Sequence, residues 1–174
     1  MEMQNPVLET LYGRRSIRDY KETPVPEDLV LEILKAAQYA PSARNTRPWH
    51  FVVVTDRELI NTLRSRHPYA SMLEKAPVCI VVCGDESKAT PGYWMIDCAA
   101  ATENMLLAAK ALGLGTCWMG VAPREERMSA VTEVLHLPEG IKPFAMVAVG
   151  YPAREPARPN RFEASRIHYN GWKE

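Results

Sequence analysis

The protein has 174 residues, of which 47% are hydrophobic and 24% are charged. A chain of this length buries about 70% of its unfolded surface, and this ordinary globular composition excludes intrinsic disorder, collagen-like chains and disulfide scaffolds. The 21 Lys and Arg residues balance the 21 Asp and Glu residues, which removes the positive field of a nonspecific nucleic-acid or membrane binder. We therefore expect a single domain over residues 1–174, with neither nucleic acid nor a membrane as its partner.

Apolar periodicity and turn residues predict that helices and strands alternate along the chain. Helices are expected at residues 4–12, 28–39, 56–65, 93–112 and 123–135. Strands are expected at residues 50–55, 78–83, 116–119 and 143–150. This alternation favours a layered α/β or α+β domain in which helices pack on a central sheet.

Two segments need partners beyond their own sequence. The helix at residues 93–112 is apolar almost all round, which is typical of a helix that packs on several sides in a core or a subunit interface. Its polar residues Asp97, Glu103 and Asn104 argue against a membrane span, and we expect them to bond across an interface or to cap backbone groups. The proline-rich tail at residues 151–174 has no apolar periodicity, so we expect it to lie across another surface.

The cysteines and the N-terminal segment indicate a reducing compartment. The four cysteines form no C-x-x-C pair and lie in or beside apolar runs, so we expect reduced thiols in the core. The four histidines add no ligand at a suitable spacing, and no metal site is predicted. No basic region followed by an apolar stretch begins the chain, so we expect a cytoplasmic location without a secretory signal.

The first polar cluster is the run RRSIR at residues 14–18. Three guanidinium groups and a hydroxyl within five residues form a fork that can bind a phosphate. In an extended backbone the first, third and fifth of these side chains point to one side. The alternative is a solvated basic turn whose arginines pair with Asp19 or Glu22.

The second polar cluster is the run APSARNTRPW at residues 40–49. Its prolines stiffen a polar loop that can present several fixed hydrogen-bond donors. The alternative is an ordinary connection from a helix to a strand, with Trp49 in the core. The neighbouring His50 is expected to be a structural histidine with satisfied hydrogen bonds.

Five blocks of the sequence together resemble the FMN-dependent nitroreductase family, from about Tyr12 to Trp172. They are RRSIRDY followed by PVP, then APSARNTRPWHFVVV, WMIDCAAATENMLLAAK, ALGLGTCWMG and VAVGYP, in the family's order and at similar spacing. The resemblance implies an α+β fold, a layered α/β/α sandwich with a central, mostly antiparallel sheet. It also implies an interlocked homodimer in which the tail at residues 153–174 wraps the partner and two FMN molecules bind at the subunit interface.

The resemblance further implies which residues bind FMN. They are Arg14, Arg15, Ser16, Arg18, Pro41, Ser42, Ala43, Asn45, Met119, Gly120 and Arg161. Arg14, Ser16 and Arg18 match the positions that hold the phosphate, the ribityl chain and the pyrimidine edge. The loop that reaches the flavin from the other subunit is matched by Pro41, Ser42, Ala43 and Asn45. Residues 119–120 match the segment that brings a backbone N–H to flavin N5, and Arg161 matches a second phosphate ligand. Arg47 stands where the family often has Gln, and it either adds positive charge near the substrate or turns outward.

The implied activity is hydride transfer from NAD(P)H through flavin N5 to a small-molecule acceptor. Nitroaromatic, quinone-like or other activated electrophiles are the expected acceptors, and both substrates use one pocket in a ping-pong scheme. No catalytic side chain is expected, because the cofactor carries the chemistry. The alternatives are another flavin reaction, such as flavin-ring cleavage, dehalogenation or enal reduction, and a non-enzymatic FMN-binding protein.

Overall fold

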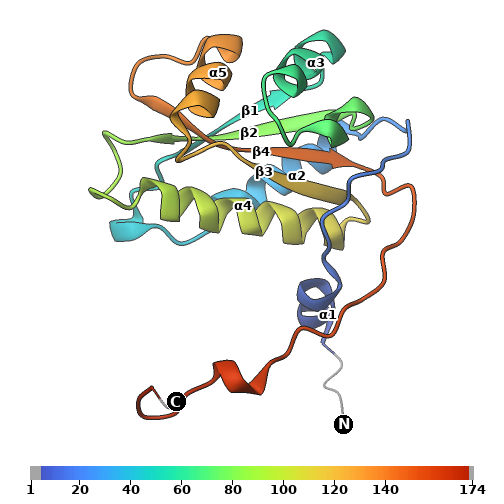
Figure 1. Ribbon diagram of the computed structural model, residues 1–174, viewed down its shortest axis with the longest axis vertical. Coiled ribbons are helices and arrows are strands. Elements are labelled where there is room, and N and C mark those ends of the chain that lie inside the picture. Colours follow the sequence, from blue (N-terminus) through green and yellow to red (C-terminus); the bar gives the residue numbers. More distant parts are fainter. Residues whose placement is uncertain (1–4, 173–174) are drawn as a thin grey trace.

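A computed structural model of the protein describes residues 5–172. Its helices are α1 (Pro6–Gly13), α2 (Glu27–Gln38), α3 (Arg57–Ser65), α4 (Trp94–Ala111) and α5 (Glu125–Leu135). Its strands are β1 (Trp49–Val54), β2 (Val78–Asp85), β3 (Gly115–Gly120) and β4 (Ile141–Gly150). The strands form one sheet in the order β1-β2-β4-β3, and each neighbouring pair is antiparallel. Figure 1 shows α2 and α4 on one face of this sheet and α3 and α5 on the other.

Strand β2 lies inside the sheet and shows why these residues form it. All eight of its residues are buried, because helices cover both faces of the sheet. Its side chains alternate between two hydrophobic cores: Ile80 and Val82 pack with residues of α2 and α4, whereas Cys79 and Val81 pack with residues of α3 and α5. A strand buried on both faces therefore appears in the sequence as a continuous apolar run.

The structure confirms the predicted sandwich and each predicted helix and strand. The observed bounds differ from the predicted ones by no more than two residues, and the predicted start of the first helix at residue 4 lies outside the described residues. The predicted cap of α3 is also confirmed, because Asp56 Oδ1 accepts a hydrogen bond from Leu59 N at 2.7 Å. The four strands are fully antiparallel, and a parallel contact occurs only as a bridge from Ser16 to Thr116 among the described residues.

Helix α4 is covered by the sheet and by α2 on only part of its surface. Its buried residues belong to the core that it shares with α2, whereas Ile96 on its other side is 61% exposed. Within the described chain, the apolar side chains on one side of α4 are therefore buried, whereas Ile96 on its other side stays exposed. Within residues 5–172, no helix is long and apolar enough to span a lipid bilayer.

The tail, residues 153–172 of the described chain, leaves the sheet and runs past α1 (Figure 1). Backbone hydrogen bonds hold its start, because Lys21 N donates to Tyr151 O at 2.9 Å and Ala153 N donates to Asp19 O at 3.0 Å. Several apolar side chains further along the tail are exposed to solvent. They are Phe162, Ile167, Tyr169 and Trp172.

Candidate functional site

Residues 14–18, which we call the basic segment, lie against the outer edge of β3. Ile17 N donates to Thr116 O at 2.8 Å. This close approach requires glycine at position 115, because a Cβ on Gly115 would lie 2.6 Å from Cγ1 of Ile17. A contact between segments far apart in the chain therefore places the basic segment beside an edge strand.

The three guanidinium groups of the basic segment have different surroundings. Arg14 Nε lies 3.5 Å from Glu103 Oε1, and Arg15 Nη1 donates to the carbonyl of Ala157 in the tail. Arg18 is exposed, and its guanidinium makes no ion pair within the described residues. The segment thus combines two partly anchored cationic groups with one that is free to meet a ligand.

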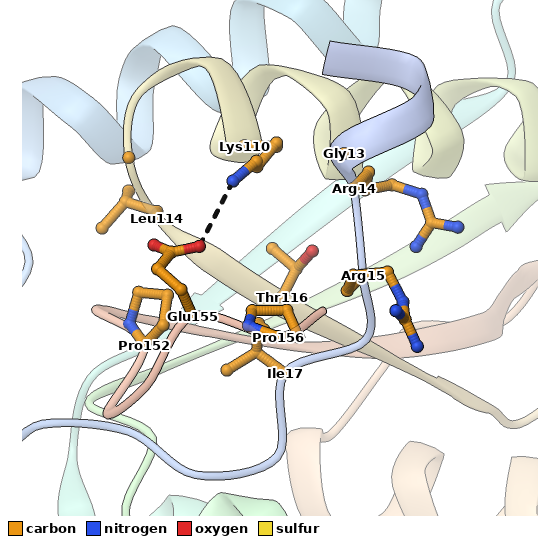
Figure 2. Close-up of a pocket in the computed structure, with 11 residues that line it drawn as sticks. Gly13, Arg14, Arg15, Ile17, Lys110, Leu114, Thr116, Pro152, Glu155 and Pro156 are labelled. Atoms are coloured by element: carbon orange, nitrogen blue, oxygen red, sulfur yellow. Dashed lines mark ion pairs between the residues drawn. The ribbon is translucent and has the colours of Figure 1, made fainter. Parts of the chain in front are cut away.

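A small cavity lies behind the basic segment (Figure 2). Its volume is about 20 Å³, which is room for one water molecule. Lys110 Nζ and Glu155 Oε2 approach to 3.6 Å on its far side, while Figure 2 shows the guanidinium groups of Arg14 and Arg15 projecting the other way. A phosphate or an aromatic ring does not fit this cavity, so a ligand of these arginines must lie on their open side.

The same outer edge of β3 continues past the basic segment to Gly120. The Thr116 carbonyl faces this edge, and strand alternation turns the backbone groups of Trp118 and Gly120 in the same direction. The Gly120 carbonyl follows this rule, because His67 Nε2 and Arg127 Nη1 each lie 2.9 Å from it. A Cβ on Gly120 would meet no atom within 4 Å. Two backbone N–H groups therefore face outward along this edge, with open space around Gly120.

His67 positions the end of β3 and was not among the predicted residues. It is 5% exposed, and its Nδ1 accepts a hydrogen bond from Tyr69 N at 3.2 Å. The neutral ring therefore carries its proton on Nε2 and donates it to Gly120 O. Burial lowers the pKa of His67, and the nearby Arg127 lowers it further, although the bond to Gly120 opposes this shift. Nothing in the local sequence around His67 signals this contact.

The polar loop, residues 41–47, connects α2 to β1 and has an unusual backbone. Arg44, Asn45 and Arg47 have φ angles of 54°, 57° and 46°, in the left-handed region that residues other than glycine rarely adopt. A hydrogen bond from Arg47 N to Ser42 Oγ at 2.9 Å closes the loop on itself. The surrounding structure therefore maintains a loop conformation that is locally unfavourable.

Asp97 on α4 holds the polar loop in place through a hydrogen bond to its backbone. It is 3% exposed, and its Oδ1 accepts a hydrogen bond from Ala43 N at 2.9 Å. Its Oδ2 is buried and accepts no hydrogen bond from the described residues. Asn104, about two helical turns further along α4, donates through Nδ2 to Ala36 O at 3.0 Å. Of the two roles expected for these side chains, the capping of backbone groups is thus seen within one chain.

The structure does not bring all predicted site residues together in one chain. The basic segment and Gly120 lie along β3 at one edge of the sheet, whereas the polar loop enters β1 at the opposite edge. Three strand spacings of about 4.8 Å separate these edges. Met119 has its side chain in the core near α3 and α5, and Arg161 is exposed in the tail. Apart from Met119 and Arg161, the predicted residues therefore form two groups at opposite edges of the sheet.

One expectation and one alternative interpretation about individual side chains are wrong. Asp19, which the alternative interpretation pairs with the arginines, lies 3.0 Å from Lys75 Nζ. His50 is exposed and makes no side-chain hydrogen bond within residues 5–172, so it is not a satisfied structural histidine. The reason is its position on an edge strand: Trp49 points into the core, and alternation turns His50 outward.

The four cysteines are confirmed as buried core thiols. All of them are free and buried, and burial raises the pKa values of Cys79, Cys83 and Cys98 to about 12. In the part of the chain that the structure describes, no group of three or more His, Cys, Asp or Glu residues is arranged to hold a metal ion.

Comparisons with known proteins identify the family and agree with the fold. The profile of the nitroreductase family matches residues 11–151. A Methanothermobacter thermautotrophicus protein named "Putative NADH dehydrogenase/NAD(P)H nitroreductase" is 46% identical over 95% of this chain and 87% of its own length. A solved structure of that same name from Parabacteroides distasonis is 41% identical with a TM-score of 0.94, covering 97% of this chain and 100% of its own. An FMN-dependent nitroreductase from Clostridium difficile is 31% identical with a TM-score of 0.89, covering 95% and 99%. The chain belongs to the nitroreductase family.

Proposed function

We propose that the protein is an FMN-dependent oxidoreductase that uses NAD(P)H to reduce nitroaromatic, quinone-like or other activated electrophiles. The observation that carries the proposal is the outer edge of β3, where the basic segment adjoins outward-facing backbone N–H groups. The names of two relatives support it, because one is described as FMN-dependent and another as an NAD(P)H nitroreductase. The cytoplasm remains the predicted location.

The donors at this edge suit FMN. The guanidinium groups of Arg14 and Arg15 and the hydroxyl of Ser16 are the groups that bind a phosphate monoester well. The N–H groups of Trp118 and Gly120 can donate to the acceptor atoms of a flat heterocycle. When bound, FMN supplies a hydride carrier between NAD(P)H and the acceptor. The chain itself binds, orients and shields the reactants, and we assign no catalytic side chain.

Arg18 has a separate role in this proposal. Its guanidinium has no anionic partner within residues 5–172, so it keeps its full charge available for a ligand. Positive charge beside a ring that becomes more negative on reduction favours the reduced form. Arg18 therefore tunes the reduction potential, whereas Arg14 chiefly contributes affinity for the phosphate.

A second copy of the chain completes the proposed site. One chain places the basic segment and Gly120 at one sheet edge and the polar loop at the other. In a homodimer the polar loop of one chain, with Ser42 and Asn45, meets the β3 edge of its partner. The buried Asp97 Oδ2, which lacks a hydrogen bond in the described chain, keeps acceptor capacity next to this loop for a donor that enters with the second copy.

The tail and an apolar groove support the same homodimer. The groove has a volume of about 410 Å³ between α1, α2 and α4, and its lining includes Val7, Leu11 and Leu107. The tail exposes Phe162 and Trp172, at 74% and 84%. Exposed apolar groups of this extent mark interaction surfaces. We infer that each tail, residues 153–174, wraps the partner chain, and that Arg161 joins the phosphate site there.

Cofactor binding tests the proposal most directly. The purified protein should hold about one FMN per chain, and Arg14→Ala should weaken FMN binding by about 1.5–3 kcal/mol, as expected for a charge-assisted contact. Arg64→Ala is the matched control, because Arg64 pairs with Glu74 at 2.9 Å on the surface of α3. Arg18→Ala should chiefly lower the reduction potential of the bound FMN, with a smaller loss of affinity for FMN. Riboflavin binding as tight as that of FMN, or equal effects of both variants on the potential, contradicts these assignments.

Kinetics distinguish the proposed enzyme from its alternatives. Varied NAD(P)H at several acceptor concentrations should give parallel double-reciprocal lines, since both substrates use one site in turn. Intersecting lines would indicate a ternary complex and a second nucleotide site. Anaerobic NAD(P)H should bleach the yellow flavin band, which a protein that only binds FMN would not do. A stopped-flow screen of acceptors then separates nitro and quinone reduction from dehalogenation, enal reduction or flavin-ring cleavage.

A further inference from the structure

Gly120 ends β3 at the proposed flavin site, although nothing in the described chain requires glycine at this position. It is exposed, and its φ angle is not positive. A Cβ built on it would meet no atom within 4 Å. A residue without a side chain in open space lets a ligand approach the backbone closely. A ligand at this end of the edge therefore meets the backbone groups of Gly120.

The two outward-facing groups of Gly120 have opposite polarity. In an edge strand the N–H and the carbonyl of one residue point the same way. The N–H attracts an electron-rich ring edge, whereas the neighbouring carbonyl oxygen repels it. A ring that becomes more negative on reduction feels this repulsion most strongly. The effect of this edge on a flavin thus depends on which groups occupy the Gly120 carbonyl oxygen.

Two side chains from the α3 and α5 face of the sheet occupy that oxygen. His67 Nε2 and Arg127 Nη1 each lie 2.9 Å from Gly120 O, which uses both lone pairs of the carbonyl. The bond from Arg127 is charge-assisted, and such bonds are about twice as strong as neutral ones. Arg127 makes no ion pair within residues 5–172, so no carboxylate offsets its charge beside the edge.

Further contacts hold both donors in place. His67 is 5% exposed, and its Nδ1 accepts a hydrogen bond from Tyr69 N at 3.2 Å, so Nε2 keeps the proton that it donates. Arg127 Cζ lies 5.3 Å from the centroid of the Tyr69 ring. Val121 N, in the same peptide group as the Gly120 carbonyl, donates to a carbonyl of β4 at 3.2 Å. This peptide group is therefore held at both ends, and the Gly120 N–H remains the free backbone donor here.

We propose that His67 and Arg127 are positioning residues that raise the reduction potential of bound FMN by occupying the Gly120 carbonyl oxygen. This role rests on the proposed function, since FMN must lie against the outer edge of β3. With both lone pairs occupied, the end of the edge presents an N–H donor and a nearby cation. Both favour the more negative, reduced ring. Neither side chain takes part in electron or proton transfer.

The reduction potential of bound FMN tests these roles without turnover. Reductive titration of the FMN-loaded protein against reference dyes measures it. His67→Leu removes one donor from Gly120 O, and it should weaken binding of reduced FMN about tenfold more than binding of oxidised FMN. That ratio equals a fall of about 30 mV for a two-electron couple. His67→Gln keeps an N–H donor and should restore most of the potential.

Arg127→Gln should lower the potential at least as much as His67→Leu, because a charge is lost with the long donor. Arg124→Gln is the matched control: Arg124 is exposed at the start of the same helix, and its side chain makes no hydrogen bond or ion pair within residues 5–172. It should leave the potential unchanged. Native potentials in both His67→Leu and Arg127→Gln overturn the inference. A fall in His67→Gln as large as in His67→Leu, or in Arg124→Gln as large as in Arg127→Gln, also overturns it.

The two half-reactions separate positioning from a general structural loss. A lower potential makes the flavin a poorer hydride acceptor and a better donor, so His67→Leu should slow its reduction by NAD(P)H but not its reoxidation. Slower rates in both half-reactions, at a native potential, would indicate structural damage and overturn the inference.

Gly120→Ala separates the inference from the proposed function. Its Cβ enters the open space at the end of β3, so it should weaken FMN binding while the chain still folds. Unchanged binding would place FMN away from Gly120 and overturn the positioning roles, whereas the reductase activity could still be measured. If the potentials shift as expected but no acceptor is reduced, the proposed reductase fails and the positioning roles stand. A protein that binds no FMN overturns both.

Discussion

The sheet and the tail use apolar residues in opposite ways. In β2, at the centre of the sheet, every side chain is buried between two layers of helices. In the tail, residues 153–172, Phe162 and Trp172 are exposed although the chain runs past α1 (Figure 1). Burial of such large side chains is a main source of stability. The sheet is therefore packed within one chain, whereas these side chains of the tail remain exposed, as the proposed wrapping of a partner chain requires.

Of the changes considered, removal of the tail should have the largest effect on assembly and on cofactor binding. A protein that ends at residue 152 should lose the homodimer and its FMN, because the exposed apolar side chains and Arg161 are then missing. The backbone bond between Lys21 and Tyr151 remains, so the sheet should still unfold cooperatively. Sedimentation velocity measures the assembly, and absorbance at the flavin band measures the cofactor.

Two outcomes would contradict the role given to the tail. One is a truncated protein that remains a yellow, fully active dimer. The other is a full-length protein that sediments as an FMN-loaded monomer, which would exclude a site shared between two chains. Replacement of Phe162 by Ser is a milder variant, and it should weaken the dimer without affecting the fold of the sheet.

Substitutions of isoleucine sharpen the same comparison. Ile80→Ala in β2 should lower the free energy of unfolding by about 2–5 kcal/mol, because it leaves a cavity at a fully buried position. Ile167→Ala in the tail, where the side chain is 46% exposed, should change it by less than about 0.5 kcal/mol. Urea denaturation of both variants under conditions that keep the chain monomeric measures the difference. Equal losses would show that the tail packs as part of the core.

The sheet could be predicted from the sequence because its signals are local. The continuous apolar run of β2 indicates a strand buried on both faces, and Asp56 before α3 is an ordinary helix cap. The exposure of His50 was not predicted, because alternation along β1 shows which residues share a face but not which strand lies at the edge. Edge position depends on the strand order β1-β2-β4-β3, which no single segment encodes.

The candidate site was only partly predictable for a related reason. The arginines of the basic segment and the residues of the polar loop stand out as clusters of donors. Their placement depends on contacts between distant segments, such as the approach of Ile17 to Gly115 and the bond from Ala43 to Asp97. His67 was missed because its role exists only when it meets Gly120. Local chemistry thus suggested a type of ligand, whereas the placement of these residues relative to one another depends on tertiary contacts.

Tyr20 joins the two regions and offers a smaller test. Its hydroxyl donates to Ile17 O at 2.6 Å, and the residue bridges to Pro152 immediately before the tail. Burial raises the pKa of Tyr20, so the hydroxyl remains a donor across the usual pH range. Tyr20→Phe should lower the free energy of unfolding by about 1–3 kcal/mol, because a buried carbonyl loses its donor.

The control for Tyr20 comes from the tail. Tyr169 is exposed, and Tyr169→Phe should leave the free energy of unfolding of the monomer unchanged within about 0.5 kcal/mol. Thermal unfolding followed by circular dichroism compares the two variants. If Tyr20→Phe loses no more stability than Tyr169→Phe, Tyr20 contributes through its ring and the hydroxyl bond to Ile17 adds little.

The pH dependence of stability should come from the sheet region and should be the smallest effect. The pKa of His67 is lowered in the folded state, chiefly by burial, so near its ordinary value of about 6.5 the unfolded chain binds the proton more readily. Stability is then complete above about pH 6.5, falls as the pH decreases toward the folded pKa, and levels off below it. His67→Gln keeps a donor for Gly120 O but cannot titrate, so it should lose this part of the slope. Urea titrations at about pH 7.5 and pH 5.5 measure the slope, which should persist in His50→Gln and in the protein that ends at residue 152. A slope that vanishes with the tail would place the titrating group there and separate His67 from the pH response.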